Sequence, residues 1–325
     1  MVATRRVLPS NVRPAHYHIA LFPDLERAAF AAEVTIDVCI AEPTREFVLN
    51  AVGLSFSEVS VHATVGDGCD GAPVTLQSVV ELTDDQQIVL QVDRAVSNAA
   101  QLRFRYTASI SDNLFAFYRS HYTYEGETCV GATQMCPAEA RRVFPCWDEP
   151  AVKATFALDI TVPAKLRVWS NGAPCEVVQL PDGLKRWAFR PAMAMSTYLV
   201  AWVIGELETA EVTVPRSAAA AAEQGGVLTS LSSIAIRAVT PRGKIQQAEF
   251  ALKVAARVLP LYEEYFQCPY VFPKLDLVAL PKFAFGAMEN WGCITFREQT
   301  LLATAEASAA QMERIAMVVV HELAH

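Results

Sequence analysis

The stretch Val318-Val-Val-His-Glu-Leu-Ala-His325 joins an apolar run to two histidines four positions apart. Residues four apart lie on one face of an α-helix, so His321 and His325 can present imidazole nitrogens to one ion about 2.0–2.1 Å away. In an H-E-x-x-H pattern the glutamate, here Glu322, is not a ligand but is placed to take a proton from water that the metal acidifies. The pattern therefore predicts a zinc hydrolase, against a chance occurrence on the order of one in a hundred.

Two histidines do not complete such a site, because catalytic zinc usually has three protein ligands. The other histidines are at positions 16, 18, 62 and 121, all in a part of the chain that reads as β-structure. His16 and His18 are expected to share a strand face, but no neighbouring carboxylate or cysteine accompanies them, which favours a surface or packing role. The third ligand is not evident from the spacing.

Composition and charge exclude several classes of protein. The 325 residues are 52% hydrophobic and 19% charged, with a net charge of -8 and no basic run, so nucleic acid is not an expected partner. No apolar run approaches the roughly 18 residues of a membrane span and no signal peptide is recognisable, so we expect no membrane partner and a cytoplasmic location. The eight cysteines form no C-x-x-C pair, which favours reduced thiols.

The periodicity of apolar residues divides the chain into two parts. Alternation typical of strands is seen at 33–40, 87–93, 101–106 and 155–162. After Pro241 the spacing becomes helical up to residue 266, residues 274–280 read as a strand, and 307–325 read as a second helix. The boundary is expected near residues 205–215, and we set the two parts at 1–208 and 209–325. The alanine-rich stretch 216–233 is interpreted as a mobile surface insertion.

A second motif, Phe285-Gly-Ala-Met-Glu-Asn-Trp-Gly292, lies about thirty residues before the histidines. Glycines on either side of a short acidic stretch suggest exposed backbone able to lie along an extended peptide, with Glu289 able to pair with a cation. Taken alone, such a segment is more often a β-turn with a solvated glutamate.

The two motifs together resemble the M1 family of zinc aminopeptidases, the gluzincins that include puromycin-sensitive aminopeptidase. Gly286-Ala-Met-Glu-Asn290 precedes His321-Glu-Leu-Ala-His325 in the order and spacing of that family. The resemblance covers nearly the whole chain through further stretches at 117–120, 133–150, 198–206, 240–244, 269–270 and 273–276.

This resemblance implies a mainly β, saddle-like N-terminal domain followed by the truncated start of a thermolysin-like α/β catalytic domain. It also implies the roles of individual residues. His321 and His325 would bind zinc, Glu322 would be the general base, and Glu289 would bind the α-amine of a peptide with a free N-terminus. Gly286 and Ala287 would offer main chain to that peptide, Gln134 would line the pocket for its first residue, and Met288 would either touch the first side chain or simply pack.

Two departures from the family pattern affect the expected activity. The family's third zinc ligand is a glutamate roughly eighteen residues after the second histidine, and its oxyanion-stabilising tyrosine lies further on. Neither is present in this chain, so we expect it to be an N-terminal portion that is inactive, or nearly so, by itself. In many members T-Q-x-E supplies a second carboxylate for the substrate amine, whereas here Cys136 takes that position and weaker amine binding is expected.

Two other functions compete with aminopeptidase activity. Epoxide hydrolysis of the leukotriene A4 hydrolase type is possible on the same fold, but that branch usually carries G-G-M-E-N and Ala287 argues against it. A peptide-binding pseudoenzyme is the second alternative, which Cys136 favours and the intact His321, Glu322 and His325 oppose.

Overall fold

The computed structural model describes residues 7–64, 71–190, 193–216 and 233–325, and in these ranges the protein consists mainly of β-sheet. The largest sheet runs in the order β11-β12-β9-β1-β2-β6-β3-β4, with β13 beside β9 and β5 beside β6. Its strands are β1 (Val12–Asp24), β2 (Ala29–Asn50), β3 (Ser55–Ala63), β4 (Ala72–Val74), β5 (Leu76–Leu82), β6 (Gln87–Ser109), β9 (Lys153–Pro163), β11 (Pro174–Gln179), β12 (Leu184–Phe189) and β13 (Met195–Ser196).

The expected strands of the first part are confirmed, with one difference. The runs 87–93 and 101–106 read as separate strands in the sequence, but the structure joins them in β6. Asn98 takes a positive φ of 65° within this strand, and the pairing of β6 with β2 shifts register around Thr44. An irregularity of this kind lets a strand continue through residues that otherwise look like a turn.

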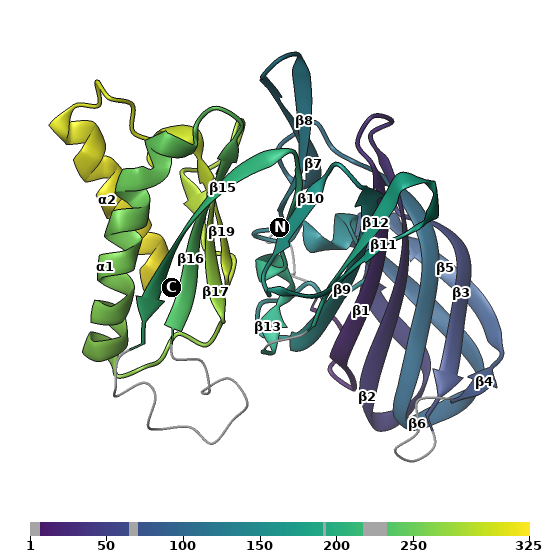
Figure 1. Ribbon diagram of the computed structural model, residues 1–325. Coiled ribbons are helices and arrows are strands. Elements are labelled where there is room, and N and C mark those ends of the chain that lie inside the picture. Colours follow the sequence, from purple (N-terminus) through teal and green to yellow (C-terminus); the bar gives the residue numbers. More distant parts are fainter. Residues whose placement is uncertain (1–6, 65–70, 191–192, 217–232) are drawn as a thin grey trace.

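A four-stranded sheet lies between the large sheet and the C-terminal part (Figure 1), in the order β10-β14-β8-β7. Its aromatic side chains pack into the large core, where Phe117 and Trp202 meet edge to face with ring centroids 5.5 Å apart. Gln134 is the last residue of β8, at one end of this sheet. The strands are β7 (Ala116–Thr123), β8 (Glu127–Gln134), β10 (Arg167–Ser170) and β14 (Trp202–Gly205).

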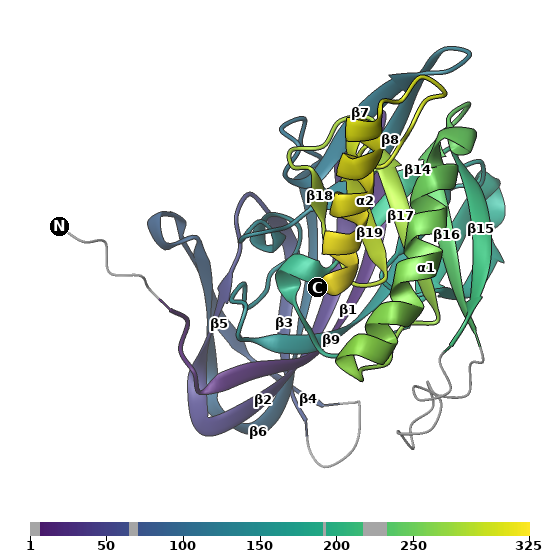
Figure 2. The ribbon, with the colours of Figure 1, turned by 90° about the vertical axis from the view of Figure 1, so that its left-hand side faces the viewer.

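The C-terminal part is a five-stranded sheet in the order β15-β16-β17-β19-β18, parallel at its centre and antiparallel at both edges. Figure 1 shows its two helices on the side away from the large sheet, and the turned view of Figure 2 shows them side by side. These elements are β15 (Leu207–Pro215), β16 (Ser233–Pro241), β17 (Lys274–Leu280), β18 (Ala287–Met288), β19 (Cys293–Arg297), α1 (Glu249–Phe266) and α2 (Ala309–Ala324). Short 3₁₀ helices occupy Thr83–Asp85, Ala140–Arg142, Pro181–Gly183, Thr197–Leu199, Ile245–Ala248 and Glu298–Thr300.

Both expected helices and the strand 274–280 are confirmed. Helix α1 buries a stripe of small and aliphatic residues, of which Ala251, Ala255 and Leu259 are four apart. Helix α2 begins at Ser308, whose hydroxyl accepts a hydrogen bond from the backbone N–H of Gln311, as an N-cap residue does. The insertion at 216–233 falls almost entirely outside the described residues.

Two hydrophobic clusters hold these layers together. The larger cluster spans the first two sheets and also takes in Val239, Val278 and Met288 from the third sheet, so packing continues across the seam between the two parts. The smaller cluster joins the third sheet to both helices. The seven cysteines of the described ranges are free, as expected, and no helix there is long and apolar enough to span a membrane.

Candidate active site

The two motif histidines lie together at the end of α2. Their Nε2 atoms are 3.3 Å apart, and both side chains are exposed. Two nitrogen ligands of a tetrahedral zinc ion, each about 2.0–2.1 Å from the metal, are separated by about 3.3–3.4 Å. The pair therefore fits two corners of such a site. Within the ranges the structure describes, no third His, Cys, Asp or Glu joins them in a cluster that could hold a metal ion.

Glu322 lies on a different face of the same helix turn. It is 8% exposed and shares the buried face with Ile315 and Val319, whereas its neighbour His321 is exposed. Burial raises the pKa of the Glu322 carboxyl to about 7, and the negative charge of Glu289 adds to this increase. A carboxyl group with a pKa near neutrality can both accept and release a proton at physiological pH.

Glu289, Glu322 and His325 line the same pocket, which has a volume of about 260 Å³. Glu289 follows β18, Glu322 lies in α2, and His325 is the C-cap residue of α2. The rest of the lining is largely aromatic and aliphatic, including Phe272, Trp291 and Ile294. A mostly apolar pocket with a few converging polar groups is typical of a small-molecule or substrate site.

Strand β18 is an edge of the third sheet, contains Ala287 and Met288, and follows directly on Gly286. The carbonyl of Gly286 accepts hydrogen bonds from the Arg297 N–H at 2.9 Å and the Thr300 hydroxyl at 2.6 Å. Ala287 is paired with Phe296 in the antiparallel ladder. Hydrogen-bonded and non-hydrogen-bonded pairs alternate in such a ladder, and the preceding residue, Gly286, is bonded to Arg297. The N–H and carbonyl of Ala287 therefore point away from β19, to the open edge of the sheet. Ala287 thus presents free main chain, the Gly286 carbonyl is already engaged, and the Met288 side chain is buried in the large core.

Two residues of the N-terminal part, Gln134 and Cys136, were expected at the site but do not line this pocket. Gln134 is 1% exposed, and neither atom of its amide group has a hydrogen-bond partner among the residues that the structure describes. Burial raises the pKa of the Cys136 thiol, and the nearby Glu289 carboxylate raises it further, so the thiol stays neutral. A buried amide group without hydrogen bonds costs free energy of folding, so the Gln134 amide is free to form hydrogen bonds with a ligand.

Tyr198 is a site residue that sequence reasoning missed. Burial raises the pKa of its hydroxyl, and the negative charge of Glu289 raises it further, which indicates that Tyr198 lies near Glu289. Its only signal in the sequence is its position at the start of the family-like stretch 198–206.

The described geometry supports a first prediction about metal binding. Adding zinc is expected to raise the free energy of unfolding of residues 1–325, because only the folded chain holds the two imidazoles 3.3 Å apart. At a zinc concentration ten times the Kd the increase is about 1.4 kcal/mol. Thermal unfolding with and without zinc measures it.

Substitution of either motif histidine tests the assignment. His321→Ala and His325→Ala should each remove the zinc-dependent shift, and His62→Ala, on the large sheet, should retain it. A shift of equal size in all three variants would mean that zinc binds elsewhere.

A helix with an H-E-x-x-H pattern beside the edge strand of a sheet is typical of a metallopeptidase. Residues 13–199 match the Peptidase M1 N-terminal domain, and residues 250–325 match the Peptidase family M1 domain. The chain belongs to peptidase family M1, a family of hydrolases.

Named relatives are aminopeptidases. Aminopeptidase M1 of Arabidopsis thaliana is 38% identical over 98% of this chain and 34% of its own length. Aminopeptidase M1-C of Oryza sativa subsp. japonica is 37% identical, again over 98% of this chain and 34% of its own length. Endoplasmic reticulum aminopeptidase 1 of Rattus norvegicus is 33% identical over 98% of this chain and 33% of its own length. The chain thus spans about a third of the length of the curated relatives it matches.

Proposed function

We propose that residues 1–325 carry the amine-recognition site and the proton-transfer residue of an aminopeptidase, which hydrolyses the N-terminal residue from peptides. The observation that carries this proposal is the shared pocket of Glu289, Glu322 and His325. If the Glu289 carboxylate binds the positively charged α-amine, only the first peptide bond can reach Glu322, so one residue is removed at a time. Such a site selects an exopeptidase reaction over cleavage within a chain.

Each residue then has a defined task. Glu289 pairs with the free α-amine, and the main chain of Ala287 at the open edge of β18 bonds to the extended peptide as an added strand does. Gln134 offers its unpaired amide to the pocket for the first residue. Glu322 accepts a proton from the attacking water and returns one to the leaving amine.

The residues present also fit a metal ion. His321 and His325 would hold zinc, as their 3.3 Å separation allows. When bound, zinc supplies Lewis-acid chemistry that acidifies water and polarises the scissile carbonyl.

The test uses a chimera in which residues 1–325 are followed by the remaining catalytic domain of the Arabidopsis relative. A dipeptide amide with a free amine should be cleaved at least about a hundredfold faster than its N-acetylated form, because acetylation leaves the Glu289 carboxylate unpaired. Liquid chromatography of the products gives both rates. Equal cleavage of the two substrates would contradict the proposal, and so would the binding of peptide N-termini without any cleavage.

A second prediction concerns Cys136, whose pKa is raised by burial and by the charge of Glu289, so that the thiol stays neutral. In the chimera, Cys136→Glu should lower KM for aminoacyl substrates about five- to thirtyfold, because a second carboxylate adds about 1–2 kcal/mol of attraction to the amine in a partly screened cleft. Steady-state kinetics measures the change. Cys136→Gln adds similar bulk without charge and should leave KM near its starting value, whereas an equal fall in both variants would assign the effect to shape.

A further inference from the structure

Asn171 joins the two parts of the molecule behind the pocket. It follows β10 and is 6% exposed. Its Nδ2 atom donates to the carbonyls of Leu199 and Trp291, both at 2.8 Å, and its Oδ1 atom accepts from the Ala201 N–H at 2.9 Å. Both amide donors are therefore used, one within the N-terminal part and the other across the seam.

These two bonds reach two segments close to residues with expected or electrostatic links to the amine site. Leu199 adjoins Tyr198, whose hydroxyl has its pKa raised mainly by burial and further by the charge of Glu289. Trp291 lies two residues after Glu289. A single side chain thus ties the backbone next to Tyr198 to the backbone that follows Glu289.

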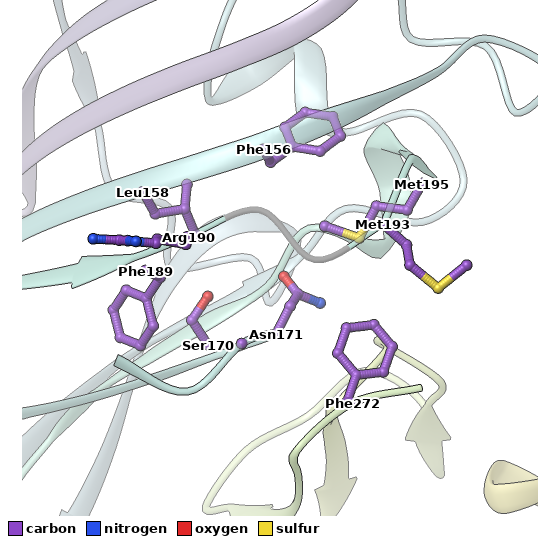
Figure 3. A pocket seen from close by; sticks show the side chains of 10 residues that line it. Phe156, Leu158, Ser170, Asn171, Phe189, Arg190, Met193, Met195 and Phe272 are labelled. Carbon is purple, nitrogen blue, oxygen red and sulfur yellow. The ribbon is translucent and has the colours of Figure 1, made fainter. Parts of the chain in front are cut away.

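The approach of the two backbones at this point is unusually close. Gly292 has a positive φ of 71°, and a Cβ atom there would lie 2.2 Å from the carbonyl oxygen of Asn171. Only glycine fits both the conformation and the space. Figure 3 shows Ser170 and Asn171 at this seam, lining a small pocket with Phe272 on the other side.

A buried lysine, Lys274, also binds the turn at Gly292. Lys274 is 3% exposed, and its Nζ atom donates to the Gly292 carbonyl and to Asp276 Oδ2, each at 2.6 Å, and also to the carbonyl of Ser170. The Gly292 carbonyl accepts a second bond from the Asp276 N–H at 3.0 Å. The backbone after Glu289 is thereby fixed to both parts of the protein.

Glu289 itself depends on this framework. No hydrogen bond or ion pair to its carboxylate is formed by the residues that the structure describes, so side-chain contacts do not orient it. Its position follows from β18 on one side and from the turn 290–292 on the other.

We propose that Asn171 is a positioning residue that sets the distance between Glu289 and a second wall of the amine site, to which we assign Gln134, Cys136 and Tyr198. This distance is the width of the subsite for the first residue of the peptide, an inference that rests on the proposed aminopeptidase function. The side chain of Asn171 bonds only to backbone groups of Leu199, Trp291 and Ala201 among the described residues, so it acts through the backbone and not on the substrate.

Removing the amide should widen the subsite. In the chimera described above, Asn171→Ala is expected to raise KM for a small first residue such as alanine about tenfold, and to shift the ratio of kcat/KM between leucine and alanine substrates about fivefold towards leucine. Zinc content should not change. Asn50→Ala is the matched control, because Asn50 is 5% exposed and accepts a hydrogen bond from the Asp148 N–H within the N-terminal part. It should destabilise the protein and leave the substrate ratio unchanged.

A second readout needs no activity. In residues 1–325, the rate of Cys136 alkylation by iodoacetamide should rise about fivefold in Asn171→Ala, because the segment that carries the thiol separates from the segment that carries Glu289. Peptide mass spectrometry measures it, with Cys129 of β8 as the internal reference. If Asn171→Ala does not fold, Asn171→Ser is the second variant.

The outcomes separate the two proposals. An inactive wild-type chimera would contradict the proposed aminopeptidase function, while the alkylation rate would still test the positioning role of Asn171. An unchanged alkylation rate, or a substrate ratio equal to that of Asn50→Ala, would overturn the positioning role.

Discussion

Glu322→Gln is expected to lower kcat of the chimera by about 10²–10⁴-fold, with little change in KM. The amide has nearly the size of the carboxyl group but cannot accept a proton from water. The carboxyl that it replaces is buried, with its pKa raised to about 7 by this burial and by Glu289. Steady-state kinetics together with zinc analysis measures the effect.

The fall in kcat must reflect the loss of proton transfer and not a loss of bound zinc. Zinc content should stay constant in Glu322→Gln, because the glutamate is not expected to be a ligand. Glu313→Gln, on the exposed face of the same helix, is the matched control and should retain full activity. A kcat within about tenfold of the parent value for Glu322→Gln would exclude it as the general base.

Asp276→Ala is expected to destabilise residues 1–325 by about 3–5 kcal/mol. Asp276 is fully buried, and its two oxygens accept hydrogen bonds from Arg237 Nε at 2.5 Å and Lys274 Nζ at 2.6 Å. Removing it leaves a buried ammonium group and a largely buried guanidinium group without their counter-charge. Urea denaturation measures the change in the free energy of unfolding.

An exposed ion pair provides the comparison. Asp112 pairs with Arg119 at 3.1 Å, but its side chain is 68% exposed. Asp112→Ala should cost less than about 1 kcal/mol, because water screens the charges and replaces the lost partner. Similar losses in the two variants would show that the Lys274–Asp276–Arg237 group does not act as a buried network.

The sequence predicted the elements that carry the site because their signals are local. Helical spacing placed His321 and His325 together and Glu322 beside them, and the structure shows that turn of α2. The mainly β first part was equally readable from its alternation. Gly286 and Ala287 were both expected to offer backbone groups to a peptide. In the structure the Gly286 carbonyl is hydrogen-bonded to β19, whereas the backbone groups of Ala287 point to the open edge. This difference depends on the register of the two strands, which the sequence does not show.

The residues that could not be predicted act through contacts between distant parts of the chain. Asn171 bonds to Trp291 across 120 positions, and nothing near it in the sequence marks it as different from other loop asparagines. Lys274 reads as a solvated charge at the start of a strand, but the fold buries it because three acceptors meet there. The extent of the two domains, 1–208 and 209–325, stays a prediction.

The parallel pairing of β1 with β9 affects how the protein can be made. His16 of β1 lies opposite Thr155 of β9, 139 positions later. At a synthesis rate of about 5–20 residues per second, β1 emerges from the ribosome roughly 7–30 s before β9. During that interval β1 can pair only with β2, and its other edge is open. The nascent chain therefore passes through a period in which the centre of the future large sheet is exposed, and chaperone binding during synthesis should concentrate there.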